Sequence, residues 1–183
     1  MKTKLTLAAL IILTLSFFPI SIQPALALPT PEDKQLYLRA QKSIKLGQKD
    51  FAFMRYGELL RRFPNSRYKD AALFGVAEYY FSAENYQEAE SHFDEYIRQN
   101  SDFKKKLFAY GYLLKIAQDN SDLAMQNKII EEILSLRQMG FVFDTSKEFH
   151  FYSAFKDHLK AIFTIDKIIF YRNDQPFVEV SYE

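Results

Sequence analysis

The chain has 183 residues, with 24 Lys and Arg against 23 Asp and Glu, abundant aromatic residues, no Trp and no Cys. The absence of Cys excludes disulfides and thiolate metal sites, so stability must come from packing. The near-neutral charge argues against a general nucleic-acid binder, because phosphate contacts require clustered cations. The one Lys triplet, residues 104–106, is expected on a solvated helix face.

The first 27 residues are typical of a signal peptide. Lys2 and Lys4 precede an apolar run over residues 5–22, and Ala25-Leu26-Ala27 supplies the small residues that a signal peptidase reads. An uncleaved anchor is the alternative, since the run approaches the length of a membrane span. Prolines at positions 19 and 24 favour cleavage before residue 28 and export to the periplasm. The mature chain is long enough for one domain with a real core.

One stretch of the chain occurs twice. Ala52, Tyr56 and Leu60 recur 37 residues later as a small, an aromatic and an aliphatic residue, at positions 89, 93 and 97. This spacing marks one helix of a repeated helical hairpin, which must stack on its neighbours to bury its apolar side. We predict a mainly α solenoid of about three such repeats over residues 28–136.

The pattern resembles the tetratricopeptide repeat, and the second copy carries the resemblance best. It places apolar, small and aromatic residues at the positions typical of that family: Leu73, Val76, Ala77, Tyr80, Tyr86, Ala89, Phe93 and Tyr96. The first copy is looser, with Leu36, Ala40, Gly47 and Pro64 in place. A third copy keeps its first helix but has Asn127 where an aromatic residue is usual.

The segment from Arg61 to Tyr68, followed by Asp70 to Leu73, narrows the resemblance to the envelope branch of the family. Pro64 ends one helix, since it lacks an N–H and restricts the preceding residue. The segment resembles BamD-like outer-membrane assembly proteins and the coordinator proteins of the Tol-Pal system. The BamD-like members usually carry a lipid-modified N-terminal Cys, which this sequence lacks. We therefore expect a periplasmic protein that is not a lipoprotein.

Past the repeats, residues 137–183 are expected to form a capping helix and a small β-hairpin. Gly140 is expected to stop the third repeat, and Thr145 with Glu148 has capping-box spacing. An apolar stripe follows at positions 151, 155, 159 and 162, and it predicts a helix lying over the last repeat. From residue 165 the period becomes two, and this predicts strands over 167–172 and 177–182.

The search for catalytic chemistry gives no candidate. His92, His150 and His158 have no metal-binding spacing, and Ser91 beside His92 points about 100° away from it on a helix. The five glycines form no phosphate-binding cluster. We expect no enzyme activity, no metal and no cofactor, and neither a nucleic acid nor a small-molecule substrate as partner.

The resemblance implies a groove on the concave face, which the first helix of each repeat lines and where peptides bind. Carried over by position, the partner-binding residues are Tyr37, Gln41, Phe74, Glu78, Phe81, Phe108, Tyr112 and Lys115. Rings with a few polar neighbours are typical of peptide-binding surfaces. The alternative is that the C-terminal helix or hairpin fills this groove and makes the rings part of the core.

The sequence thus predicts a non-enzymatic periplasmic scaffold that binds an envelope protein or peptide through its concave face. One alternative is an assembly subunit whose C-terminal hairpin edge pairs with a partner strand. The other is a non-catalytic helical domain of a cell-wall enzyme. The pattern names neither the partner nor the oligomeric state.

Overall fold

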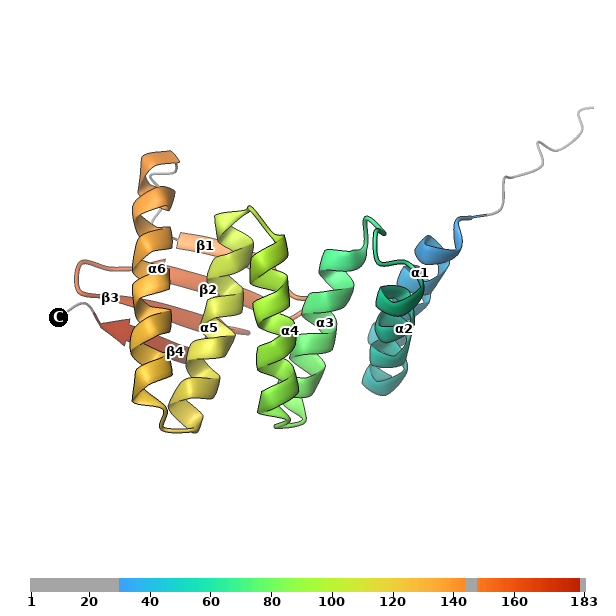
Figure 1. Ribbon diagram of the computed structural model, residues 1–183, viewed down its shortest axis with the longest axis horizontal. Helices are drawn as coiled ribbons and strands as arrows, with labels where there is room; N and C mark the ends of the chain where they lie inside the picture. The colour runs from blue at the N-terminus through green and yellow to red at the C-terminus, as the bar shows by residue number, and fades with distance from the viewer. Residues whose placement is uncertain (1–29, 144–147, 182–183) are drawn as a thin grey trace, which may run out of the picture.

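The computed structural model describes residues 30–143 and 148–181. Within them, three helical hairpins follow one another along the molecule, and a four-stranded sheet lies across the second and third of them (Figure 1). Hairpin 1 is α1 (Glu32–Lys45) with α2 (Lys49–Arg62), and hairpin 2 is α3 (Lys69–Ser82) with α4 (Tyr86–Gln99). Hairpin 3 is α5 (Phe103–Asp119) with α6 (Leu123–Phe143). None of the helices in the described ranges is apolar over a length sufficient to cross a membrane.

The turns inside the three hairpins repeat at the period seen in the sequence. Gly47, Glu84 and Ser121 all have positive φ, at +70°, 57° and 56°. In each turn the following N–H bonds back to a helix carbonyl, as from Gln48 to Ser43 and from Asn85 to Tyr80. The predicted repeat is therefore confirmed in all three copies, including the third, where the aromatic residue is missing. Only the first copy has the glycine that this conformation favours.

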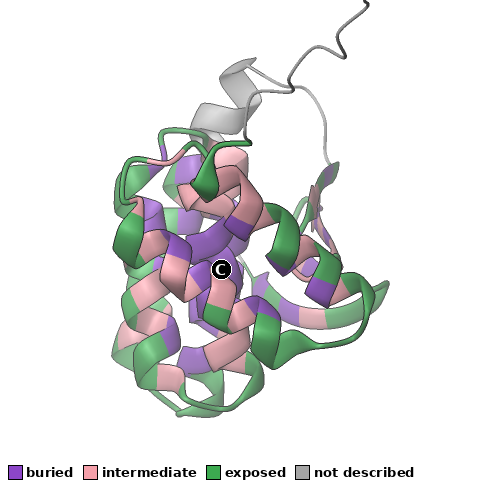
Figure 2. Cartoon of the chain, turned by 90° about the vertical axis from the view of Figure 1, so that its right-hand side faces the viewer, coloured by how far each residue is buried: buried purple, intermediate pink, exposed green. Residues whose placement is uncertain are grey.

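The helices differ in how far they are buried. In α3 every residue from Ala72 to Glu78 is buried, because α2 and α4 pack on its sides and Phe151 and Phe177 of the sheet contact its remaining face. In α4 a single stripe is buried, with Ala89 and Phe93 inside and acidic residues outside. Figure 2, viewed from the hairpin 1 end, shows buried residues facing the middle of the molecule and exposed ones on its outer side.

The chain after the repeats corrects one prediction. Residues expected to form a capping helix form two strands instead, β1 (Glu148–Tyr152) and β2 (His158–Phe163). Helix α6 runs through Gly140 to Phe143, so the expected stop at that glycine is also wrong. Thr145, the proposed cap, lies outside the described residues.

The predicted C-terminal hairpin is confirmed as β3 (Lys167–Arg172) and β4 (Gln175–Ser181). The four strands are antiparallel in the order β1-β2-β3-β4, so β3 is an inner strand and β1 and β4 form the edges. A β-bulge interrupts the pairing at Phe170 and Tyr171, next to Pro176 at the start of β4.

One face of the sheet is apolar and packs on the helices. Phe149, Leu159, Ala161, Phe170 and Val178 alternate along the four strands and are all buried. They join the same core as residues of α3, α4, α5 and α6. A lone hairpin would be marginal in water, whereas four strands packed on helices make a stable layer.

Two glycines allow the layers to approach closely. A Cβ at Gly111 in α5 would lie 2.9 Å from the Phe170 ring, and one at Gly75 in α3 would lie 2.7 Å from the Tyr56 ring. The Gly75 position also faces the Cβ of Ala154, in the loop between β1 and β2, at 2.9 Å. That loop is thereby fixed between hairpins 1 and 2.

Candidate functional site

The sheet covers the concave face over hairpins 2 and 3, where the open groove was predicted. Phe74 in α3 and Phe108 in α5 are 1% and 2% exposed, and both rings contact Phe151 of β1. Tyr112 is also buried, with its ring against Phe177 of β4. The predicted binding rings are therefore core residues here, in line with the alternative that C-terminal structure fills the groove.

The other predicted residues of these hairpins are likewise engaged. Phe81 is half-buried against Phe177 and Tyr112. Lys115 is half-buried and pairs with Asp119 one turn later on α5. Neither side chain is free to contact a partner in the centre of a groove.

Glu78 is the most unusual of the predicted groove residues. Its side chain is fully buried, and the Tyr112 hydroxyl donates a 2.7 Å hydrogen bond to one carboxyl oxygen. The other oxygen, Oε2, accepts no hydrogen bond from the part of the chain that the structure describes. Burial raises the pKa of Glu78 to about 7, against the lowering effects of Tyr112, Arg172 and Ser153. Burial, followed by the Glu78 carboxylate, raises the pKa of Tyr112 well above its ordinary value.

Glu78 belongs to a polar network that joins the repeats to the sheet. Arg172 at the end of β3 lies over the Tyr112 ring, 5.8 Å from its centroid. The same guanidinium donates from Nε to Oδ2 of Asp157 at 2.8 Å, and Asn173 donates to the other oxygen of Asp157. These bonds lower the pKa of Asp157 against the effect of its burial. The network holds the β1–β2 loop in place.

The concave face is open beside hairpin 1, past the end of the sheet. A cavity of about 330 Å³ lies there, between α1, α3, the start of α5 and the β1–β2 loop. Three of the predicted groove residues, Tyr37, Gln41 and Phe74, are among its lining residues. The structure thus brings these three together and moves the other five out of any open groove.

Aromatic rings form much of this cavity wall. Tyr37 stacks on Tyr68 at a centroid distance of 4.4 Å, and the Arg67 guanidinium lies over the Tyr68 ring, 4.8 Å from its centroid. Tyr152 at the rim is 68% exposed. Gln41 donates a 2.6 Å hydrogen bond to the Tyr56 hydroxyl, which fixes the amide at the floor.

The charged residues that line the cavity are mainly basic. Arg67, Lys105 and Lys156 face it together with a single carboxylate, Asp70. Lys105 pairs with that carboxylate at 3.0 Å, so Asp70 is already neutralised. Within residues 30–143 and 148–181, Lys156 forms no ion pair, and it occupies a positive-φ turn at 72°. The cavity therefore combines rings with uncompensated positive charge.

Sequence reasoning missed Arg67, Tyr68 and Lys156 because it searched only the first helix of each repeat, and it missed Lys105, which does lie on such a helix, for another reason. Arg67 and Tyr68 lie in the same turn that carried the envelope resemblance, and this was a usable signal. Lys105 belongs to the Lys triplet that was assigned to a solvated face. Lys156 reaches the cavity only because its segment is a loop between strands.

The histidines do not gather into a reactive site. His92 stacks on Tyr80, while His150 and His158 stack on each other on the outer face of the sheet, with ring nitrogens 2.9 Å apart. In the part of the chain that the structure describes, no three His, Asp or Glu side chains are placed to hold a metal ion.

Comparison with known proteins agrees with the resemblance drawn from the turn at Pro64. No curated protein matches this sequence. The family model YfiO, described as outer membrane lipoprotein, matches residues 29–150, which is more than half of the chain and includes all three hairpins. The prediction of a BamD-like repeat protein is confirmed by this match, which points to the cell envelope. The chain belongs to the YfiO family of outer membrane lipoproteins.

Proposed function

We propose that this protein is a non-enzymatic scaffold of the bacterial envelope that binds a segment of another envelope protein. Membership of the YfiO family supports a role in protein interaction related to outer-membrane assembly. We further propose that it works in the periplasm, since its sequence contains no Cys to carry a lipid.

The observation that carries this proposal is the cavity beside hairpin 1. Its walls offer stacked tyrosines and three cations against one carboxylate that is already paired. Such a surface suits an extended segment with acidic and apolar side chains, because rings supply desolvated contact area and cations supply orientation. The rigid hairpin and sheet hold the cavity in shape, so little ordering entropy is lost on binding.

A photo-crosslinking amino acid placed at Tyr152 tests the proposal in the native envelope. Tyr152 lies at the cavity rim and is exposed, so the probe is expected to capture a specific envelope protein. The same probe at Lys128, an exposed position on α6, serves as the matched control. The charge reversal Lys156→Glu is expected to abolish the crosslink without lowering the melting temperature. Equal crosslinking at both positions, or a crosslink that survives the reversal, would exclude this cavity as the binding site.

The edge of the sheet offers a second mode of binding, with a weaker basis. β4 is an edge strand, so a partner strand could pair with it, as the sequence alternative holds. Lys167 of β3 and Glu179 of β4 form a 3.0 Å ion pair, so the edge strand carries a charged side chain. A crosslinking probe at Glu179 that captures the partner while Tyr152 does not would favour this alternative.

A further inference from the structure

The tip of hairpin 1 exposes apolar side chains that the core does not use. Leu46 at the end of α1 is 60% exposed, and Phe51 and Met54 at the start of α2 are 52% and 64% exposed. Phe51 and Met54 are three residues apart on one helix and so lie on the same side. The three side chains stand at a convex turn, and they make a protruding apolar wedge.

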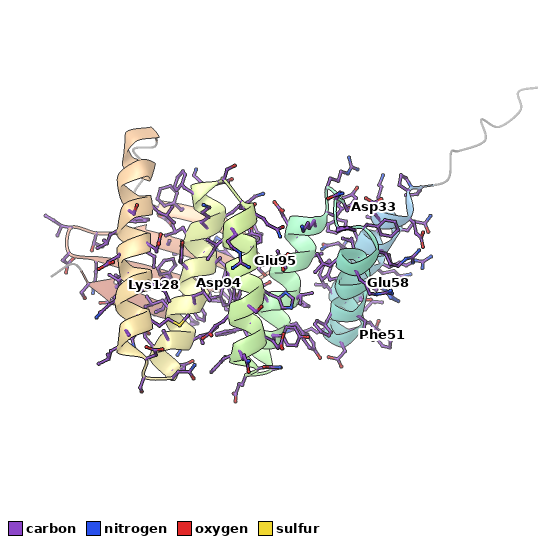
Figure 3. The ribbon with its side chains drawn as sticks, in the orientation of Figure 1. Asp33, Phe51, Glu58, Asp94, Glu95 and Lys128 are labelled. Carbon is purple, nitrogen blue, oxygen red and sulfur yellow. The ribbon has the colours of Figure 1, made fainter. Side chains whose placement is uncertain are left out.

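Three lysines lie near these residues in the sequence, and the ammonium of one of them, Lys49, lies 6.0 Å from the ring centroid of Phe155 in the β1–β2 loop. Lys42 and Lys45 lie in the last turn of α1, and Lys49 is the first residue of α2. The nearest carboxylate, Asp50, already accepts a 2.8 Å hydrogen bond from the Tyr79 hydroxyl. Figure 3 shows Phe51 at the free end of the hairpin, with Glu58 and Asp33 progressively farther towards its opposite end.

The charge of hairpin 1 differs from that of the rest of the protein. Residues 32–62 contain eight Lys and Arg against four Asp and Glu, whereas residues 63–183 contain fourteen against nineteen. Two of the four acidic residues of the hairpin, Glu32 and Glu58, pair with Arg62 at the end of α2. The positive excess therefore concentrates towards the tip, while the remainder of the chain is acidic.

We propose that the tip of hairpin 1, formed by Leu46, Phe51 and Met54 with Lys42, Lys45 and Lys49, docks on an anionic lipid surface. Isolated protruding apolar side chains insert into the acyl boundary of a bilayer, and flanking lysines bind anionic headgroups. A protein partner would more often offer a pocket for such residues than a flat acidic surface. The acidic remainder of the chain is repelled by the same surface, so the hairpin is presented end-on.

Because the protein contains no Trp, the fluorescence of a single introduced Trp reports whether its own position enters the lipid. Phe51→Trp gives the protein a single Trp at the tip, and Leu123→Trp gives a matched control at a 72% exposed position beside the turn of hairpin 3. Both variants would be expressed with the native N-terminal segment and purified from the envelope. With vesicles of phosphatidylglycerol in phosphatidylcholine, Phe51→Trp is expected to shift its emission to the blue, and Leu123→Trp is not. Pure phosphatidylcholine vesicles are expected to leave both unchanged.

Charge removal supplies the second arm of the test. Lys42→Gln, Lys45→Gln and Lys49→Gln together are expected to weaken binding to the anionic vesicles on the order of a hundredfold, since each lysine contributes about fivefold. Lys128→Gln on α6 is the control and should have no effect. No blue shift at position 51, an equal shift at position 123, or a shift seen only with an envelope protein fraction would overturn the proposal. The last result would assign the tip to a protein partner.

Discussion

Glu78 makes the stability of this protein depend on pH in a direction that can be worked out from the structure. The folded protein holds the carboxyl proton up to about pH 7, whereas an unfolded chain releases it near the ordinary value of 4.5. Over that interval the unfolded state binds fewer protons, so the free energy of unfolding falls as the pH rises. The stabilising contribution is complete below 4.5 and is lost as the pH passes through 7.

The size of the effect follows from the width of the interval. Each pH unit over which only the folded protein keeps the proton is worth about 1.4 kcal/mol. Between about pH 5 and about pH 8 this carboxyl therefore removes roughly 3 kcal/mol of unfolding free energy. The groups that face it are the Tyr112 hydroxyl, the Ser153 hydroxyl, Arg172 and Asp157, from α5, the β1–β2 loop and β3. None of them offers a full compensating ion pair to the ionised form.

Glu78→Gln removes the titration while keeping an acceptor for the Tyr112 hydroxyl. We expect the variant to lack this pH slope, so that its free energy of unfolding relative to wild type rises by roughly 3 kcal/mol between about pH 5 and about pH 8. Urea melts at several pH values measure this, with Glu88→Gln, an exposed residue of α4, as the control. Parallel pH profiles for wild type and Glu78→Gln would refute the reasoning.

Three further predictions concern packing. Gly75→Ala is expected to cost about 1–3 kcal/mol in urea melts because its Cβ would meet the Tyr56 ring, whereas Gly57→Ala, with open space, should stabilise by about 0.5–1 kcal/mol. Phe74→Ala and Phe108→Ala should each lower stability by about 3–5 kcal/mol, and unchanged thermal melts would return these rings to an open groove. Ala89→Leu should lose about 1–3 kcal/mol by overpacking, and a stability equal to wild type would contradict the repeat register.

The repeats could be predicted from the sequence because their physical signal is local. Small residues at Ala52 and Ala89, with aromatic residues four positions later, are what two crossing helices require, and they recur at a fixed period. The positive-φ turns keep that period even at Glu84 and Ser121, where the residue type gives no hint. Tertiary packing of the hairpins therefore imposes the turn on residues that do not favour it.

The capping helix was wrongly predicted because the spacing of apolar residues there fits both a helix and a strand. Phe151, Phe155 and Leu159 are spaced by four, and four is both close to one helical turn and a multiple of the strand period of two. Phe151 and Leu159 do lie on the same side, as cross-strand partners on the inner face of a hairpin. Phe155 lies in the loop between the strands. Apolar residues at every second position were the better signal, because this spacing predicts strands: Phe149 and Phe151, then Leu159, Ala161 and Phe163.

The sequence predicted which residues lie on the concave face, but not that the sheet covers most of them. Tyr37 and Phe74 occupy equal repeat positions, 37 residues apart, while Phe108 lies 34 residues after Phe74, about one helical turn early. The structure still places them on one face, because Phe74 and Phe108 both contact Phe151 and Tyr37 lines the adjoining cavity. What covers that face depends on long-range contacts of the sheet, which no local pattern reports. Glu78 did carry a signal, since a single acid within the apolar run from Ala71 to Phe81 indicates a buried or partnered carboxyl.

The sheet makes hairpin 1 different from hairpins 2 and 3, whereas the hairpins of a simple repeat stack are alike. In a simple solenoid each hairpin contacts only its neighbours, and its whole concave face stays free. Here the strands cross hairpins 2 and 3, and the β1–β2 loop reaches hairpin 1 through Ala154, which shares a core cluster with Leu36, Ala40 and Tyr56. Hairpins 2 and 3 thereby become a rigid base with a closed face, and hairpin 1 is left with both the open cavity and the exposed tip. Substitutions at exposed positions of hairpin 1 are thus expected to change binding with little loss of stability, because few core contacts depend on them. Substitutions beneath the sheet are expected to do the reverse, and a binding defect there without a stability defect would contradict this division.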